Sequence, residues 1–313
     1  RVSAPDPAVS LLLSTWLPAQ LLCSRVRAKA GFQQAGGATG FRDQLQDMLA
    51  LRYTDPAAVR AHLLEAAAHQ FEAGDVQHWW HEPALGVRTR ISDDKLFLPY
   101  AAAEYIEATG DMGVLDETAP YLTGPEIPEG REDCYGSAER SEAVGTLRQH
   151  CLRAIESVQI GAHGLPLMGA GDWNDGMSRV GVEGRGESVW LGFFLAETLR
   201  RFAPLCPEET HKALLARREA LLAAAEEHAW TGGWYARAWF DSGEILGAPG
   251  CAECEIDLTA QVWAVFAGAA HAREALESAL DRLVDREHGI VRLLDPPFDG
   301  AGDPGYIRAY PPG

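Results

Sequence analysis

Two carboxyl groups and an indole share one short turn, the segment Gly-Asp-Trp-Asn-Asp-Gly at residues 171–176. An aromatic ring beside a carboxyl group covers a sugar face and excludes water, which raises the pKa of the carboxyl and keeps it protonated. A protonated carboxyl can donate to a glycosidic oxygen. Taken alone, however, such a turn is better interpreted as a solvated loop in which Asp and Asn cap their own backbone. Other motifs must decide between the two.

Two further segments place acids and arginines beside glycine and aromatic residues. One spans Gly36–Asp47, and the other spans His78–Asp94 with the runs HWWHEP and RTRISDD. Together with the turn, they resemble the glycoside hydrolase family 94 phosphorylases. The resemblance is strongest to the β-1,2-glucan group, which comprises the phosphorylase-like domain of cyclic β-1,2-glucan synthase and the β-1,2-oligoglucan phosphorylases. It extends from about Asp6 to Gly313.

The resemblance implies a role for each residue of the turn. A phosphorylase needs a general acid but no base, because inorganic phosphate is itself the nucleophile. The family's acid falls on Asp175, and the tryptophan that lines its sugar site falls on Trp173. Asp172 is expected to orient the turn rather than to react.

Three residues nearer the N-terminus are expected to bind the sugar that is transferred. Asp43 matches the family aspartate that hydrogen-bonds the hydroxyl groups of this sugar. Arg42 fits sugar recognition and a structural ion pair equally well. Lys29 stands where the family has an arginine, so the charge is kept and the planar fork is lost.

The charged cluster before the next apolar helix has two interpretations. Its members are Arg88, Arg90, Asp93 and Asp94. The aspartates can cap the helix while the arginines form surface pairs. Alternatively, at least one acid binds a sugar hydroxyl, and on this reading we expect Arg90, Asp93 and Asp94 among the substrate-binding residues.

No metal or organic cofactor is expected, and inorganic phosphate is the expected co-substrate. His78 and His81 lie beside two tryptophans with no third ligand in view, so they are interpreted as walls of a sugar groove. Cys251 and Cys254 have the spacing of a metal or redox pair, but no second pair completes a site. The 6 cysteines are too scattered for a disulfide framework and predict reduced thiols in a cytosolic protein.

The net charge of the chain limits the classes of binding partner that we expect. The 313 residues include 45 Asp and Glu against 27 Lys and Arg, a formal charge of -18 that disfavours nucleic acid and anionic lipid. The expected partners are a β-glucan oligosaccharide and phosphate, with a homodimer left open. The apolar stretch Ala8–Ser24 contains several polar residues and predicts a buried helix rather than a membrane span. The expected location is the cytoplasm, with a soluble domain of an inner-membrane protein as an option.

Helical patterns dominate the chain. Asp55 and Pro56 predict a helix start, and apolar residues then recur every fourth position until Phe71. Similar patterns predict helices over Asp6–Arg27, Phe41–Leu51, Leu98–Thr109, Ser141–Val158, Ser188–Phe202, Glu208–Trp230, Ile256–Ala270 and His271–Asp285. The connections 74–93, 123–138, 160–187, 231–253 and 287–313 are long and rich in Gly and Pro. They carry or adjoin the motifs, as functional loops do.

The resemblance implies an all-α fold, an (α/α)6 barrel that forms one catalytic domain over residues 1–313. The predicted helices are fewer than the twelve of a closed barrel, and the chain begins at Arg1. It ends at Gly313, before the family segment that holds a further glutamate, a histidine and the remaining phosphate ligands. We therefore expect a barrel that is incomplete at its C-terminus, from a fragment or a truncated gene product.

The expected reaction is the inverting transfer of glucose from β-1,2-glucan to phosphate, which gives α-glucose 1-phosphate as part of cyclic β-1,2-glucan synthesis. The linkage rests on the resemblance alone. Two alternatives stay open. One is hydrolysis on the same barrel, which requires a base that activates water. The other is a carbohydrate-binding or regulatory fragment without turnover.

Overall fold

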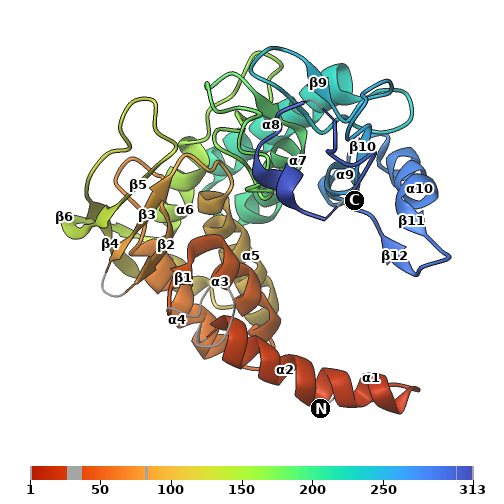
Figure 1. Ribbon diagram of the computed structural model, residues 1–313. Helices are drawn as coiled ribbons and strands as arrows, with labels where there is room; N and C mark the ends of the chain where they lie inside the picture. The colour runs from red at the N-terminus through yellow and green to blue at the C-terminus, as the bar shows by residue number, and fades with distance from the viewer. Residues whose placement is uncertain (1, 27–36, 82–83, 301, 312–313) are drawn as a thin grey trace. The chain divides into compact units, whose positions relative to one another are not determined.

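The computed structural model describes residues 2–26, 37–81, 84–300 and 302–311 (Figure 1). The chain divides into two compact units. Unit 1 comprises Arg1–Thr89 and Glu104–Ala154, and unit 2 comprises Arg90–Ala103 and Ile155–Gly313. The division falls within helix α5 (Phe97–Thr109).

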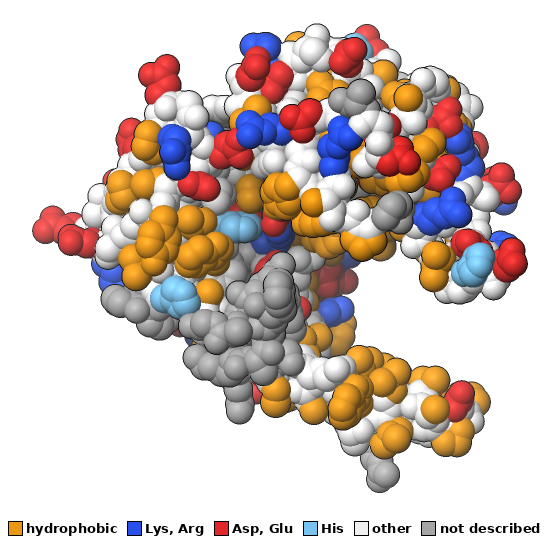
Figure 2. All heavy atoms as spheres, in the orientation of Figure 1, with side chains coloured by type: hydrophobic (Ala, Val, Ile, Leu, Met, Phe, Trp, Pro, Cys, Tyr) orange, Lys and Arg blue, Asp and Glu red, His pale blue; other side chains and the backbone are white. Residues whose placement is uncertain are grey.

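Unit 1 begins with a helical segment that alternates between α and π geometry. It consists of α1 (Pro7–Leu11), η1 (Leu12–Trp16), α2 (Leu17–Gln20) and η2 (Leu21–Val26). None of the described side chains from Ala8 to Cys23 is buried, so the prediction of a buried helix here is wrong. Figure 2 shows the hydrophobic side chains along this segment, where Leu11 is 65% and Trp16 62% exposed. No helix among the described residues is long and apolar enough to cross a membrane.

Helix α4 (Pro56–Ala67) confirms the predicted start at Asp55. The Asp55 side chain accepts a hydrogen bond from the Ala58 N–H at 3.2 Å, and Pro56 occupies the first turn, where its missing N–H costs nothing. The helix ends before Phe71, because the chain then folds back. The Phe71 N–H donates to the Asp75 carbonyl at 2.8 Å and closes a turn.

The other helical elements of unit 1 flank two antiparallel sheets. The helical elements are α3 (Phe41–Met48), η3 (Leu49–Leu51), the end of α5, η5 (Met112–Asp116) and most of α6 (Leu147–Glu156). The first sheet has the order β1 (Thr39–Gly40), β2 (Gln77–His81), β3 (Leu85–Thr89), β5 (Asp133–Ser137). The second pairs β4 (Thr118–Thr123) with β6 (Glu139–Thr146).

A network of neutral polar side chains lies inside unit 1. The His69 ring shares a 2.8 Å hydrogen bond with Gln77, whose amide donates to the Ala84 carbonyl at 2.9 Å. The His150 ring shares a second 2.8 Å hydrogen bond, with Gln70. Burial lowers the pKa of His69 to about 4 despite its bond to Gln77, and burial also lowers the pKa of His150. Both rings are therefore neutral near pH 7.

Unit 2 is built on helices that pack in sequence order. Helix α7 packs against α8 and α9, and α9 packs against α10. Their bounds are Val189–Phe202, Glu208–Ala224, Leu258–Ala267 and Ala272–Leu283. The other helical elements are the start of α5, the end of α6, η4 (Asp94–Leu96), η6 (Ala203–Leu205), η7 (Ala225–Ala229) and η8 (Tyr306–Ala309). Ser188 caps α7 by accepting the Leu191 N–H at 3.0 Å, and Asp257 caps α9 by accepting the Ala260 N–H at 3.1 Å. Both helix starts are thereby fixed.

Short strands connect these helices. One sheet has the order β7 (Glu187–Ser188), β8 (Ala238–Trp239), β9 (Ile245–Leu246). Two further pairs join β10 (Ile256–Asp257) to β13 (Leu294–Asp295) and β11 (Val284–Asp285) to β12 (Ile290–Val291).

The prediction of an all-α (α/α)6 barrel is wrong. The described residues contain strands β1 to β13 in five sheets. Many of these strands lie where long loops were predicted, and the predicted helix Ser141–Val158 begins as strand β6, with α6 starting only at Leu147. The physical reason is that the N–H and C=O groups of long connections need partners. Segments such as Gln77–His81, rich in aromatic residues, find them by pairing as strands.

Candidate active site

The turn at residues 171–176, called the acid turn below, lies in unit 2 and is held by main-chain hydrogen bonds on one side. Gly171 has φ 132°, a conformation that favours glycine. Its carbonyl oxygen accepts the N–H and the Oγ–H of Ser92 at 3.0 and 3.1 Å. The preceding Ala170 N–H donates to the Arg90 carbonyl at 3.1 Å. The structure thus brings Arg90 and Ser92, from the segment predicted to bind substrate, against the start of the acid turn.

Another segment holds the opposite end of the acid turn. The Gly176 carbonyl accepts the Ile307 N–H at 2.8 Å, and the Arg179 N–H donates to the Pro304 carbonyl at 3.1 Å. Within the turn, the Gly176 N–H donates to the Asn174 Oδ1 at 3.1 Å. Both ends of the turn are therefore fixed by backbone groups, which leaves its side chains to act.

Asp172 is fully buried and engaged by charged and polar donors. Arg237 donates from both of its terminal nitrogens to the two carboxylate oxygens, each at 2.7 Å. The Ser188 hydroxyl donates at 2.6 Å and the Asn174 N–H at 3.0 Å. Burial alone would raise the pKa of Asp172, but the charge of Arg237 and these hydrogen bonds hold it below its ordinary value. Asp172 is therefore an ionised acceptor and cannot serve as a proton donor.

A second carboxyl group faces the same guanidinium. Asp257 is 1% exposed, and its Oδ2 lies 3.5 Å from the Arg237 Nε. Burial raises the pKa of Asp257, and the neighbouring Arg237 only partly offsets that effect. The guanidinium itself is 1% exposed and keeps its proton, because the two carboxyl groups outweigh its own burial.

Trp173 and Asp175 contrast with Asp172 in their exposure. Trp173 is 42% exposed and Asp175 is half-buried, whereas Asp172 between the same two glycines has no exposed surface. The acid turn therefore separates its two carboxyl groups. One is fixed inside unit 2, and the other keeps a surface that a ligand can reach.

The charged cluster is divided between the units. Arg88 belongs to unit 1, where its side chain donates two hydrogen bonds to Asp75. Arg90 is exposed in unit 2, two residues before Ser92. Asp93 and Asp94 are 0% and 1% exposed, and Asp93, which precedes η4, forms no side-chain capping bond to it. Capping by Asp93 is thus absent at that position, and sugar binding by Arg90, Asp93 and Asp94 stays a prediction.

The predicted sugar-binding residues near the N-terminus lie in unit 1 or outside the described residues. Arg42 and Asp43 occupy the first turn of α3, with the Arg42 Nε 3.8 Å from an Asp43 oxygen. This spacing fits the ion-pair interpretation of Arg42, which is buried, while Asp43 is partly exposed. Lys29 lies outside the described residues. The proposed roles of all three stay predictions.

The histidines and cysteines form no recognisable centre in the part of the chain that the structure describes. His81 contacts Trp79 edge-on at a ring distance of 5.8 Å. No group of three or more His, Cys, Asp or Glu residues there is arranged to hold a metal ion. None of the described cysteines forms a disulfide.

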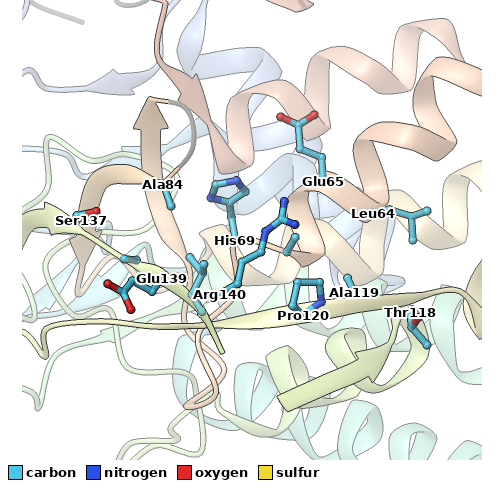
Figure 3. Close-up of a pocket in the computed structure, with 13 residues that line it drawn as sticks. Leu64, Glu65, His69, Ala84, Thr118, Ala119, Pro120, Ser137, Glu139 and Arg140 are labelled. Carbon is cyan, nitrogen blue, oxygen red and sulfur yellow. The ribbon is translucent and has the colours of Figure 1, made fainter. Parts of the chain in front are cut away.

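A cavity of about 620 Å³ opens in unit 1, and none of the described residues of the predicted site lines it (Figure 3). Its polar lining includes Glu65, His69, Glu139 and Arg140, set among alanine, leucine and proline side chains. The lining contains no tryptophan or tyrosine on which a sugar ring could stack. The size of this cavity therefore does not make it the candidate active site.

Sequence reasoning missed Arg237, Ser188 and Asp257. Arg237 is separated from Asp172 by 65 positions, so no local spacing connects them. The one available signal was the composition around Arg237, a lone arginine between Ala236 and Ala238 in an aromatic run. A charge in such a position suggests a buried ion pair but does not identify its partner.

Comparison with known proteins shows the family to which the chain belongs. Residues 1–313 match the Glycosyl hydrolase 94 superfamily, catalytic domain. The chain is 45% identical over its full length to the cyclic beta-(1,2)-glucan synthase NdvB of Rhizobium meliloti (strain 1021), of which it covers 11%. It is 31% identical over its full length to the solabiose phosphorylase of Paenibacillus borealis, of which it covers 38%. The chain thus spans well under half of either relative.

A solved structure supports a shared fold. The rhamnosidase from Klebsiella oxytoca with rhamnose bound superposes with a TM-score of 0.59. The match covers 90% of this chain and 48% of the rhamnosidase at 14% identity, a level that speaks to the fold alone. The family match, by contrast, extends over every position of the sequence, including the acid turn and the segment that braces it. The chain belongs to the glycosyl hydrolase 94 superfamily and corresponds to its catalytic domain.

Proposed function

We propose that this chain carries the catalytic centre of a glycoside phosphorylase in which Asp175 is the general acid. The observation that carries the proposal is the difference in burial between the two aspartates of the acid turn. Asp172 is buried, ionised and bound to Arg237, whereas Asp175 is half-buried and follows the exposed Trp173 by two positions. A general acid must be reachable by the leaving group, and of these two aspartates only Asp175 meets that requirement.

The proposed reaction needs one reacting group from the protein, the carboxyl group of Asp175. An oxygen of inorganic phosphate attacks the anomeric carbon from the face opposite the leaving sugar. The bond from that carbon to the glycosidic oxygen breaks, and Asp175 gives its proton to this oxygen. Phosphate arrives already anionic, so no base is needed, and inversion turns a β-linked donor into an α-sugar 1-phosphate. Asp175 recovers a proton from solvent after the products leave.

The remaining predicted residues are assigned to substrate binding. Trp173 offers an exposed indole ring for a sugar, Arg90 lies in the segment that braces the acid turn, and Asp93 and Asp94 directly follow that segment. Arg42, Asp43 and Lys29 are proposed to bind the transferred sugar, as the resemblance implies. We propose no metal or organic cofactor for the reaction.

The proposed donor is a β-1,2-linked glucan. The support is the 45% identity to a protein named as a cyclic beta-(1,2)-glucan synthase, compared with 31% to solabiose phosphorylase. On this proposal the chain takes part in cyclic β-1,2-glucan synthesis by phosphorolysis. The chain covers only 11% of the synthase, so the comparison supports the substrate class through this segment alone.

Phosphate dependence tests the proposal. The full-length protein is incubated with β-1,2-glucan in buffers with and without phosphate, and the products are identified by NMR. We expect α-glucose 1-phosphate only when phosphate is present. Free glucose at equal rates in both buffers would move the protein to the hydrolases. Glucan binding without any product would make it a carbohydrate-binding protein.

A further inference from the structure

Arg237 joins the acid turn to the starts of two helices. Its terminal nitrogens donate to Asp172 at 2.7 Å, and one of them lies 3.3 Å from the Ser188 hydroxyl. Ser188 is the N-cap of α7. On the other side, the Nε of Arg237 faces Asp257, the N-cap of α9, at 3.5 Å. One side chain thus contacts the acid turn and two helix caps.

The backbone of Arg237 is fixed as firmly as its side chain. Its N–H donates to the Leu246 carbonyl at 2.7 Å, and its carbonyl accepts the Val189 N–H at 3.1 Å. Gly247 has φ 83°, and a Cβ placed there would lie 2.4 Å from the Arg237 nitrogen. Since the strand packs this closely, the main chain of Arg237 has no room to shift. The acid turn is therefore held, through the Arg237 side chain, to a fixed main-chain position.

Asp172 transmits this constraint along the turn. Its Oδ1 accepts both the Arg237 side chain and the N–H of Asn174, the residue directly before Asp175. A carboxylate held by a bidentate guanidinium has little freedom to rotate. The backbone that carries Asp175 is therefore tied to Arg237 through two consecutive hydrogen bonds.

We propose that Arg237 is a positioning residue for phosphorolysis, which holds Asp172 and through it sets the placement and electrostatic surroundings of Asp175. This inference rests on the proposed function, in which Asp175 is the acid. The charges around Arg237 support it. Asp172 and Asp257 both face one guanidinium, so the loss of Arg237 leaves the carboxylate of Asp172 uncompensated, three residues before the acid. A nearby negative charge makes Asp175 hold its proton more tightly.

The kinetic test compares Arg237→Gln, Arg237→Lys and the double variant Asp172→Asn/Arg237→Gln in the full-length protein. A misplaced acid lowers the rate of the chemical step, so Arg237→Gln should reduce kcat by about 10²-fold with KM nearly unchanged. The alkaline limb of its kcat profile should move to higher pH. The double variant should recover part of kcat, because two neutral amides can pair and the orphaned charge of Asp172 is gone. Unchanged kcat and an unchanged pH profile in folded Arg237→Gln would overturn the proposal.

Arg217→Gln is the matched control. Arg217 also lies in unit 2 and donates to the carbonyl groups of Ile155 and Val158 at 2.9 and 3.2 Å, none of which belongs to the acid turn. Its loss should lower the melting temperature while kcat and the pH profile stay as in the wild type. An equal fall of kcat in both variants would reduce Arg237 to a structural residue and overturn the proposal.

A second readout does not depend on activity. The ¹³C resonance of the Asp175 carboxyl, identified by its absence in Asp175→Asn, is titrated in the wild type, Arg237→Gln and the double variant. We expect a displaced titration midpoint in Arg237→Gln and a midpoint closer to wild type in the double variant. Identical midpoints would overturn the inference even in an active enzyme. A wild-type protein that shows no phosphate-dependent turnover would defeat the proposed function, while this titration would still decide the role of Arg237.

Discussion

Unit 1 and unit 2 each bury a network of polar side chains, and the network of unit 1 is neutral whereas that of unit 2 is charged. In unit 1, His69, Gln77 and His150 are neutral and satisfy one another or backbone carbonyls. In unit 2, Asp172 and Arg237 are charged and almost completely excluded from water. A neutral network needs only its hydrogen bonds, whereas a buried charge needs a counter-charge in good geometry.

This difference indicates which of the two networks marks the candidate active site. The neutral network lies beside a roomy cavity yet offers no ionised group of its own near pH 7. The charged network lies under a compact turn and distinguishes two aspartates three residues apart. Burial of charge, rather than the volume of a cavity, therefore marks the candidate active site.

The largest loss of activity is expected when the accessible aspartate, Asp175, is substituted. Asp175→Asn removes the transferable proton but keeps the shape of the side chain, so phosphorolysis should fall by about 10²–10⁴-fold. Melting temperature and glucan binding should stay close to wild type. The measurements are initial rates of sugar 1-phosphate release and a thermal melt. Rates like those of the wild type would exclude Asp175 as the acid.

Asp172→Ala should act on stability as well as on activity. It leaves Arg237 buried with only Asp257 opposite, and breaking a buried ion pair in this way costs about 3–5 kcal/mol. Urea unfolding measures the loss, and Asp175→Asn serves as the control in the same turn. A free energy of unfolding that matches that of the control would mean that the charged network contributes no more than an ordinary surface pair.

A smaller loss of stability is expected in the neutral network of unit 1 when the pH falls. The pKa of His69 falls from about 6.5 to about 4 on folding, so between these values the unfolded chain binds more protons than the folded chain. Stability is complete above about pH 6.5 and is lost as pH falls; near pH 5 the loss is roughly 2 kcal/mol. Urea unfolding at the two pH values should show this slope, and His69→Gln should flatten it. A slope that is the same in His69→Gln would assign the acid sensitivity to other groups.

The smallest loss of stability is expected from Asp55→Ala, a substitution outside both networks. It removes the cap of α4, an exposed hydrogen bond to the Ala58 N–H, and should cost about 1 kcal/mol. The effect should be independent of pH across the range in which His69 titrates, and it should leave phosphorolysis unchanged. Denaturant unfolding at both pH values checks it. A loss as large as that of Asp172→Ala would remove the contrast between the buried charges and the rest of the chain.

The predictions from sequence succeeded where neighbouring residues decide the structure. Asp55 and Pro56 start α4 because a cap and a fixed φ act within one turn of helix. The predicted helices Ser188–Phe202 and Ile256–Ala270 likewise begin within two residues of α7 and α9, which start after the polar residues Ser188 and Asp257. These signals are local, so they can be read without knowing the rest of the fold.

Prediction failed where distant residues decide the outcome. The segment Ser141–Thr146 has a polar composition that fits a helix surface, but it forms β6 because β4 offers it a partner. The apolar run Ala8–Ser24 suggested burial, yet none of its described side chains is buried, since apolar character alone does not supply a neighbour. The partnership of Asp172 with Arg237 across 65 positions is the same kind of non-local information. The acid turn itself was predicted, but the network that holds it was not.

The hydrogen bond inside the acid turn also bears on how the protein ages. Asp175 precedes Gly176, and in flexible chains an Asp-Gly pair cyclises when the glycine nitrogen attacks the aspartate side chain, which yields isoaspartate. Here the Gly176 N–H is held by the Asn174 Oδ1 at 3.1 Å, and the Gly176 carbonyl is held by Ile307. The folded turn therefore restrains the nitrogen that would attack the proposed acid. Chemical damage at Asp175 should accumulate during unfolding and storage stress rather than during turnover.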